Sequence, residues 1–181
     1  MENQRSHRDT TFYLSNGDVT LIPVSPSHHE MLYGYCQVDP RSFEWRFLGA
    51  SPNYERFVAH VGGDVLLQLV AMDTVHQQPL GLLTAHPANI RDGHTQLAIA
   101  TDSWENLPFG AVDLFISYLF KHWPLRKIYI DLLDAQYDRF ASCADADTMR
   151  IEGRRLNHRF LDGQFLDLVT VAIDSAIWTR L

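Results

Sequence analysis

Few side chains in this sequence have the types and spacing that metal or disulfide chemistry requires. The two cysteines, Cys36 and Cys143, form neither a disulfide framework nor a Cys-x-x-Cys metal motif. The adjacent histidines His28 and His29 lack further cysteine or carboxylate ligands at the spacing of a metal site. We therefore expect no bound metal. His94 is a candidate acid–base group, because an imidazole titrates near neutrality.

The composition indicates one soluble, globular, cytoplasmic protein. Of its 181 residues, 46% are hydrophobic and 20% are charged, which is enough apolar material for a core. Its apolar runs fall short of the ~20 residues of a membrane span, and the polar start of the chain lacks a signal peptide. A net charge of −7 argues against a nucleic-acid partner. We interpret the arginines within 154–159 as a solvated strand face.

The pattern of apolar residues predicts the elements that must position any site. Helix caps are expected at Ser25–Ser27, with Glu30 completing a capping box, and at Ser51-Pro52. The Asp162-Gly163 pair predicts a tight hairpin. Strands are expected over 18–25, 64–73, 79–88, 94–101, 127–133, 149–160 and 165–173, and helices from the first cap to 38, from the second cap to 62, over 110–123 and over 137–146.

This order predicts an α+β arrangement on one mixed sheet. Residues 1–17 are expected to be a disordered or loosely attached tail, and 18–181 a single domain.

Three segments carry a resemblance to a known family. The stretch Ile151–Asp167, with its Glu-Gly and Asp-Gly pairs, resembles the closing hairpin of the GNAT superfamily of N-acyltransferases, in the branch of ribosomal-protein N-terminal acetyltransferases. Gln78–Leu83 is similar to that branch's third strand, and Gln96–Phe120 to its strand–loop–helix. The resemblance implies a three-layer α/β/α fold around a mixed, mostly antiparallel, splayed sheet of about seven strands.

The resemblance also implies an acyl-CoA donor, acetyl-CoA or another. In the family the pantetheine arm pairs with the fourth strand, and the pyrophosphate binds N–H groups at the following helix N-terminus. The matching loop here is degenerate, since Pro108 replaces a glycine and Glu105 replaces a Gln or Arg. The expected cofactor-binding residues are Ile99, Ala100, Thr101, Leu107, Phe109, Gly110, Ala111, Val112 and Gln136.

For catalysis, the resemblance points to replacements for the usual groups. Gln96 stands where the branch commonly carries a glutamate base, and an amide cannot take a proton. The candidate substitutes are His94, for which a surface role at the turn is the alternative, and Asp102 at the strand end. The usual tyrosine acid falls near Cys143, while Tyr137 would have to reach back. Cys143 could instead donate a proton or accept an acyl group, or simply pack.

The expected function is acyl transfer to an amine of a small molecule or a protein N-terminus, by direct attack in a ternary complex. Tyr33, Trp45 and His158 are expected to bind that acceptor, with core packing as the alternative. Two other functions stay open: use of an acyl-carrier-protein thioester, and a non-catalytic binding module. Nucleic acid and membrane are not expected partners, and a homodimer is left open.

Overall fold

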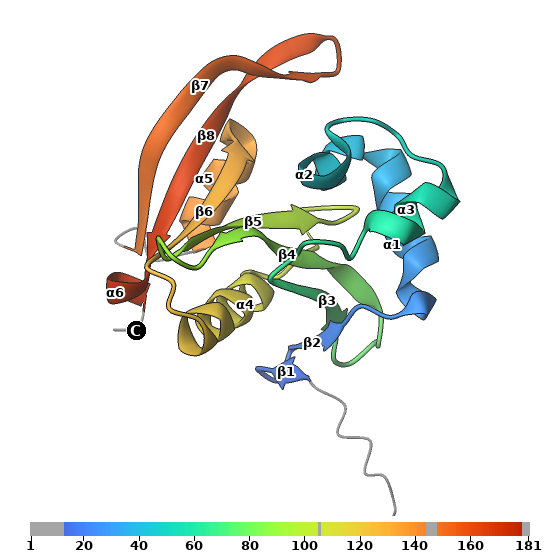
Figure 1. Cartoon of the computed structure of the whole chain (residues 1–181), viewed down its shortest axis with the longest axis horizontal. Helices are drawn as coiled ribbons and strands as arrows, with labels where there is room; N and C mark the ends of the chain where they lie inside the picture. The colour runs from blue at the N-terminus through green and yellow to red at the C-terminus, as the bar shows by residue number, and fades with distance from the viewer. Residues whose placement is uncertain (1–12, 105, 144–147, 179–181) are drawn as a thin grey trace, which may run out of the picture.

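One mixed sheet organises this computed structural model, which describes residues 13–104, 106–143 and 148–178. Within those residues the sheet has eight strands in the order β1-β2-β3-β4-β5-β6-β8-β7 (Figure 1). Every neighbouring pair is antiparallel except β5 and β6, which are parallel. The strands are β1 (Leu14–Ser15), β2 (Val19–Pro23), β3 (Leu67–Asp73), β4 (Pro79–Asn89), β5 (His94–Ala100), β6 (Lys127–Leu133), β7 (Met149–Leu161) and β8 (Gln164–Asp174).

Helices cover both faces of the sheet, which confirms the expected α+β fold. The helical segments are η1 (Pro26–His28), α1 (His29–Val38), η2 (Pro40–Phe43), α2 (Glu44–Phe47), α3 (Tyr54–His60), α4 (Phe109–His122), α5 (Asp134–Cys143) and α6 (Ser175–Trp178). Among the described residues, no helix combines the length and apolarity needed to cross a membrane.

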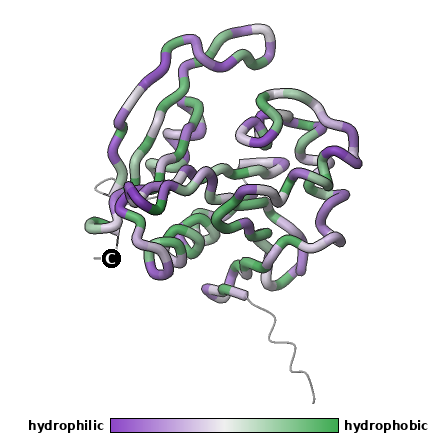
Figure 2. The backbone as a smooth tube through the Cα atoms, viewed as in Figure 1, coloured by the Kyte–Doolittle hydropathy of each residue, from purple (hydrophilic) through white to green (hydrophobic). Residues whose placement is uncertain are grey.

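Two hydrophobic clusters hold the helices to the sheet. Alternation along β3 sends Leu69 to the cluster under α4 and Val70 to the cluster under α1 and α3. Phe115 of α4 and Phe57 of α3 are fully buried in these two clusters. Hydrophobic colour predominates along α4 in Figure 2, and the deep packing expected for this helix is confirmed.

The sheet opens between β5 and β6. These strands pair over only three positions, from His94 with Lys127 to Gln96 with Tyr129. Beyond them the two ribbons diverge, while the long β7–β8 hairpin arches toward α2 (Figure 1). The expected splayed sheet is therefore confirmed.

The N-terminal edge has one strand more than expected. Leu14 pairs with Leu21 in a small β1–β2 hairpin, within the stretch expected to be a tail. Asn16 Oδ1 accepts the Val19 N–H at 3.0 Å, and Gly17 has a φ of 101°, so the Asn-Gly pair makes the turn. Residues 1–12 lie outside the described part of the chain.

Three helix starts differ from the expected ones. His28, not Glu30, closes the first capping box, with its Nδ1 3.0 Å from the Ser25 nitrogen. Asn53, not Ser51, caps α3 by accepting the Arg56 N–H at 2.9 Å. Helix α5 begins at Asp134, three residues before the expected start.

Candidate functional site

A cavity of about 390 Å³ lies where β5 and β6 separate. Its lining includes residues 97–99 of β5 and 130–133 of β6, together with residues of η2, α2, β4 and β7. Since β5 and β6 do not pair here, their facing backbone edges border this space.

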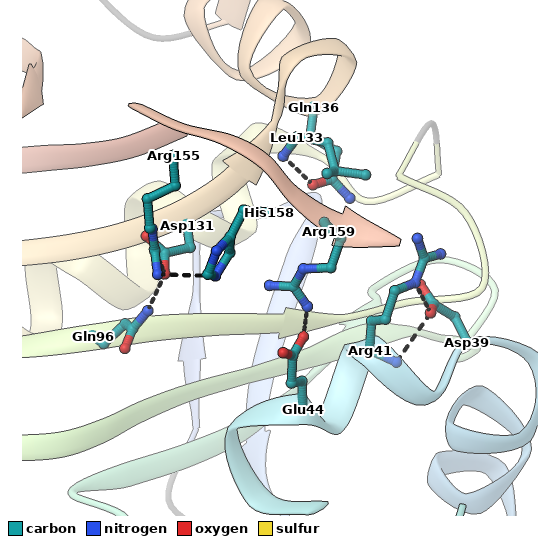
Figure 3. Close-up of polar contacts among 10 residues, drawn as sticks. All are labelled: Asp39, Arg41, Glu44, Gln96, Asp131, Leu133, Gln136, Arg155, His158 and Arg159. Carbon is teal, nitrogen blue, oxygen red and sulfur yellow. Dashed lines mark hydrogen bonds and ion pairs between the residues drawn. The ribbon is translucent and has the colours of Figure 1, made fainter. Parts of the chain in front are cut away.

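Two ion pairs of η2, α2 and β7 border the cavity. Arg41 Nε lies 2.5 Å from Asp39 Oδ1, within η2 and its cap. The Glu44 carboxylate of α2 pairs with the Arg159 guanidinium of β7. This second pair joins segments from opposite ends of the chain (Figure 3). We call Asp39, Arg41, Glu44 and Arg159 the cavity roof.

Asp131 of β6 anchors a hydrogen-bond network on the opposite wall. Its Oδ1 accepts the Thr170 hydroxyl at 2.6 Å. Its Oδ2 accepts from Gln96 Nε2 at 3.1 Å and from Arg155 Nη2 at 2.5 Å. With both oxygens engaged by donors, this carboxylate holds Gln96, Arg155 and Thr170 in place.

His86 of β4 is the buried titratable group of the cavity. The residue is only 7% exposed, and its Nε2 has no hydrogen-bond partner among the described residues. The ring stacks on Trp45, with centroids 4.3 Å apart and planes at 28°. Burial lowers the pKa of His86 to about 4, and the nearby charge of Arg46 contributes. At neutral pH the ring is therefore uncharged.

The strand pattern explains why His86 faces this way. In the pleated β4, Leu82, Thr84 and His86 share one face, and the latter two are buried polar residues in an apolar run. A register shift follows at Pro87, where the missing N–H suits a bulge. Sequence reasoning missed His86, although a histidine within the apolar stretch 79–88 was the available signal.

Two of the three expected acceptor-binding residues line the cavity. Trp45 lies against His86, and His158 lies beside Arg155, with Nε2 3.4 Å from Arg155 Nη1. Tyr33 instead packs edge-on to Tyr54 in the α1–α3 cluster, and its hydroxyl donates to a backbone carbonyl at 3.2 Å.

The expected catalytic residues are not gathered at the cavity. His94 lies where β5 and β6 are still paired, with its ring against Tyr129, and it is not part of the lining. Tyr137 packs against the α4 cluster outside the lining. Cys143 ends α5, and its side chain lies outside what the structure describes.

The expected cofactor-binding residues do not lie together in one place. Ile99 and Gln136 line the cavity, and Gln136 Oε1 accepts the Leu133 N–H at 2.9 Å. Ala100 packs in the α1–α3 cluster, and the buried Thr101 donates to a backbone carbonyl at 2.8 Å. Leu107, Phe109 and Val112 line a small hollow of about 20 Å³ at the start of α4.

The loop before α4 adjoins the cavity. Trp104 lines both the cavity and the small hollow. Pro108 is the N-cap of α4 and supplies no side-chain cap, while Ala111 N donates to the Pro108 carbonyl at 3.0 Å. The Gly110 carbonyl accepts from Asn16 Nδ2 at 3.4 Å. Glu105 lies outside the described residues.

No metal centre is evident in the described ranges. Within 13–104, 106–143 and 148–178, no three His, Cys, Asp or Glu side chains gather as a metal site would require.

The overall structure matches solved N-acetyltransferases. The spermidine N-acetyltransferase from Vibrio cholerae, solved with CoA and spermine, gives a TM-score of 0.71 at 14% identity, over 91% of this chain and 99% of that chain. A GCN5-related N-acetyltransferase from Brucella melitensis gives 0.66 at 17% identity, over 93% and 81%. No protein-family model matches the sequence, and no curated protein matches it. The chain therefore has the GCN5-related N-acetyltransferase fold, and a cavity lies where β5 and β6 part.

Proposed function

We propose that this protein is an acyl-CoA-dependent N-acyltransferase that acts on an amine. The observation that carries the proposal is the buried, unpartnered Nε2 of His86 at the cavity between β5 and β6. The fold shared with N-acetyltransferases supports the reaction class. The 151–167 hairpin motif supports the branch that includes ribosomal-protein N-terminal acetyltransferases.

The residues around the splay fit an acyl-CoA. The first turn of α4 has no side-chain cap, so its backbone N–H groups suit an anion such as a pyrophosphate. The β5 edge at Ile99 and Ala100 is unpaired on the β6 side and suits an extended pantetheine arm. When bound, the thioester would supply an activated acyl carbonyl. Pro108 offers one donor fewer than a glycine would.

Residues of this protein would then deprotonate and orient the amine. His86, neutral at physiological pH, takes a proton from the amine as the nitrogen attacks the acyl carbon and the carbon–sulfur bond breaks. The stack with Trp45 holds the imidazole in one orientation. The described residues that line the cavity include no tyrosine, so we propose no tyrosine acid for the leaving thiolate.

An amine acceptor is supported by the spermine bound to the Vibrio cholerae enzyme. Pro108 favours a second candidate donor, an acyl-carrier-protein thioester, which does not depend on the same pyrophosphate contacts. A non-catalytic binding module is less well supported, because a buried histidine with a free lone pair is costly to keep without a role.

The test is calorimetric titration of the protein with acetyl-CoA, CoA and longer acyl-CoAs. We expect micromolar binding, followed by thiol release when an amine library is added. Absence of binding up to millimolar concentration would remove free acyl-CoA as the donor. Activity with an acylated carrier protein alone would then support the second candidate.

A further inference from the structure

Every carboxylate among the described residues of the cavity lining is paired with an arginine of the same lining. The pairs are Asp39 with Arg41, Glu44 with Arg159, and Asp131 with Arg155. A carboxylate already matched in this way is a weak site for an additional cation. The cavity is therefore not built to attract a polyamine.

The arginines keep donors beyond these pairs. A guanidinium has five N–H donors, and the pair with Asp39 uses only Nε of Arg41. Arg41 Nη1 is buried and has no hydrogen-bond partner among the described residues. A buried donor without a partner costs free energy that an incoming acceptor atom would recover.

Arg159 lies close to Arg41, whose Nη1 has no partner among the described residues. Burial lowers the pKa of Arg159, and the positive charge of Arg41 lowers it further, while Asp39 acts in the opposite sense. Both side chains reach into the space between β7 and η2 (Figure 3). The unpartnered Nη1 of Arg41, beside a second guanidinium, fits an acceptor oxygen of an anion.

Resting on the proposed function, we propose that the acceptor is a small amine that also carries a carboxylate, and that Arg41 and Arg159 bind this carboxylate. The amine then lies toward His86, which lines the same cavity. A volume of about 390 Å³ suits a molecule of amino-acid size with an acyl group beside it. Arg41 and Arg159 are thus specificity-determining residues, and His86 acts on the nitrogen.

The first experiment compares acids with their neutral amides. Glycine, 4-aminobutyrate and 6-aminohexanoate are each titrated beside the corresponding amide, with spermine as a polycationic probe. Binding is measured by calorimetry without acyl-CoA, and KM by thiol release with acetyl-CoA. We expect at least one acid to be preferred over its amide by about ten- to a hundredfold, because its carboxylate gains charge-assisted hydrogen bonds.

The second experiment tests whether Arg41 causes the preference for acids over amides. Arg41→Gln should abolish most of the acid-over-amide ratio, with a larger effect on KM than on kcat. The matched control is Arg154→Gln on the same strand as Arg159, since Arg154 pairs with Asp134 outside the cavity lining. The control should keep the full ratio. Because the wild-type ratio is informative alone, a poorly folded Arg41 variant would not prevent the test.

Two results separate this inference from the proposed function. Turnover of amines with no preference for acids, or with a preference for spermine, overturns the inference and leaves the acyltransferase function intact. Selective acid binding without any acyl-CoA turnover overturns the function and keeps the carboxylate site. If no carboxylate-bearing amine of the panel binds or turns over, the inference is wrong.

Discussion

The two sides of the cavity are built on different principles. The cavity roof uses charged side chains, and Glu44 and Arg159 connect α2 with β7. On the other side, Leu107 is buried and Pro108 is the N-cap of α4 without a side-chain cap, so the helix start offers backbone groups. Side chains can be exchanged one by one to change a partner, whereas backbone groups bind whatever suits their geometry. Selectivity is therefore expected on the roof side and a generic anion site on the α4 side.

The largest predicted effect is on kcat and not on the binding of acyl-CoA. His86→Phe keeps an aromatic ring for the stack with Trp45 and removes both ring nitrogens. We expect kcat to fall by about a hundredfold or more, the range typical of a lost general base, with the Kd of acyl-CoA unchanged. Steady-state kinetics and calorimetry measure the two quantities. Unchanged turnover would show that His86 only fills space.

Because of His86, we predict that the free energy of unfolding depends on pH. His86 has a folded-state pKa of about 4 against an ordinary value of 6.5, so the unfolded chain binds more protons between these values. The free energy of unfolding should fall as pH drops from 6.5 toward 4, by up to about 3 kcal/mol. Urea unfolding at several pH values, compared between wild type and His86→Phe, isolates this contribution. Parallel curves for the two proteins would argue against it.

A smaller effect is expected on the α4 side. A Cβ at Gly110 would lie 2.8 Å from Asn16 Nδ2, so Gly110→Leu must displace Asn16 or move the start of α4. We expect acyl-CoA to bind about tenfold more weakly, since a hydrogen bond to a charged group is lost. Pro108→Ala adds one N–H and should act in the opposite direction. Gly153→Leu, where the space is open, is the control. Equal affinity in all variants would place the anion elsewhere.

The long elements were predictable from the sequence because their patterns are unambiguous. The strand expected over 127–133 matches β6 residue for residue, and Asp162-Gly163 forms the predicted hairpin turn. Short elements were not predictable in the same way. Helix α2 has only four residues, too few to be stable without the contacts that its buried Phe47 makes in the α1–α3 cluster.

The site was harder to predict than the fold. Trp45 and His158 could be placed from the resemblance, and both line the cavity. The prediction for His94 rests on its imidazole and on its place in the matching strand, but the parallel pairing with β6 keeps that end of the strand closed. The partnership of Glu44 with Arg159 depends on how the closing hairpin bends over the sheet, and no local sequence pattern encodes that curvature.

The pair of Glu44 and Arg159 also bears on the order of folding. It joins α2 (Glu44–Phe47) to β7 (Met149–Leu161), two segments that lie far apart in the sequence. Contacts between such distant segments require the closure of a long loop and form late. The strands β2 to β6 and helix α4 can assemble before the final hairpin arrives. We therefore expect the cavity roof to be completed in the last stage of folding, after most of the secondary structure is already in place.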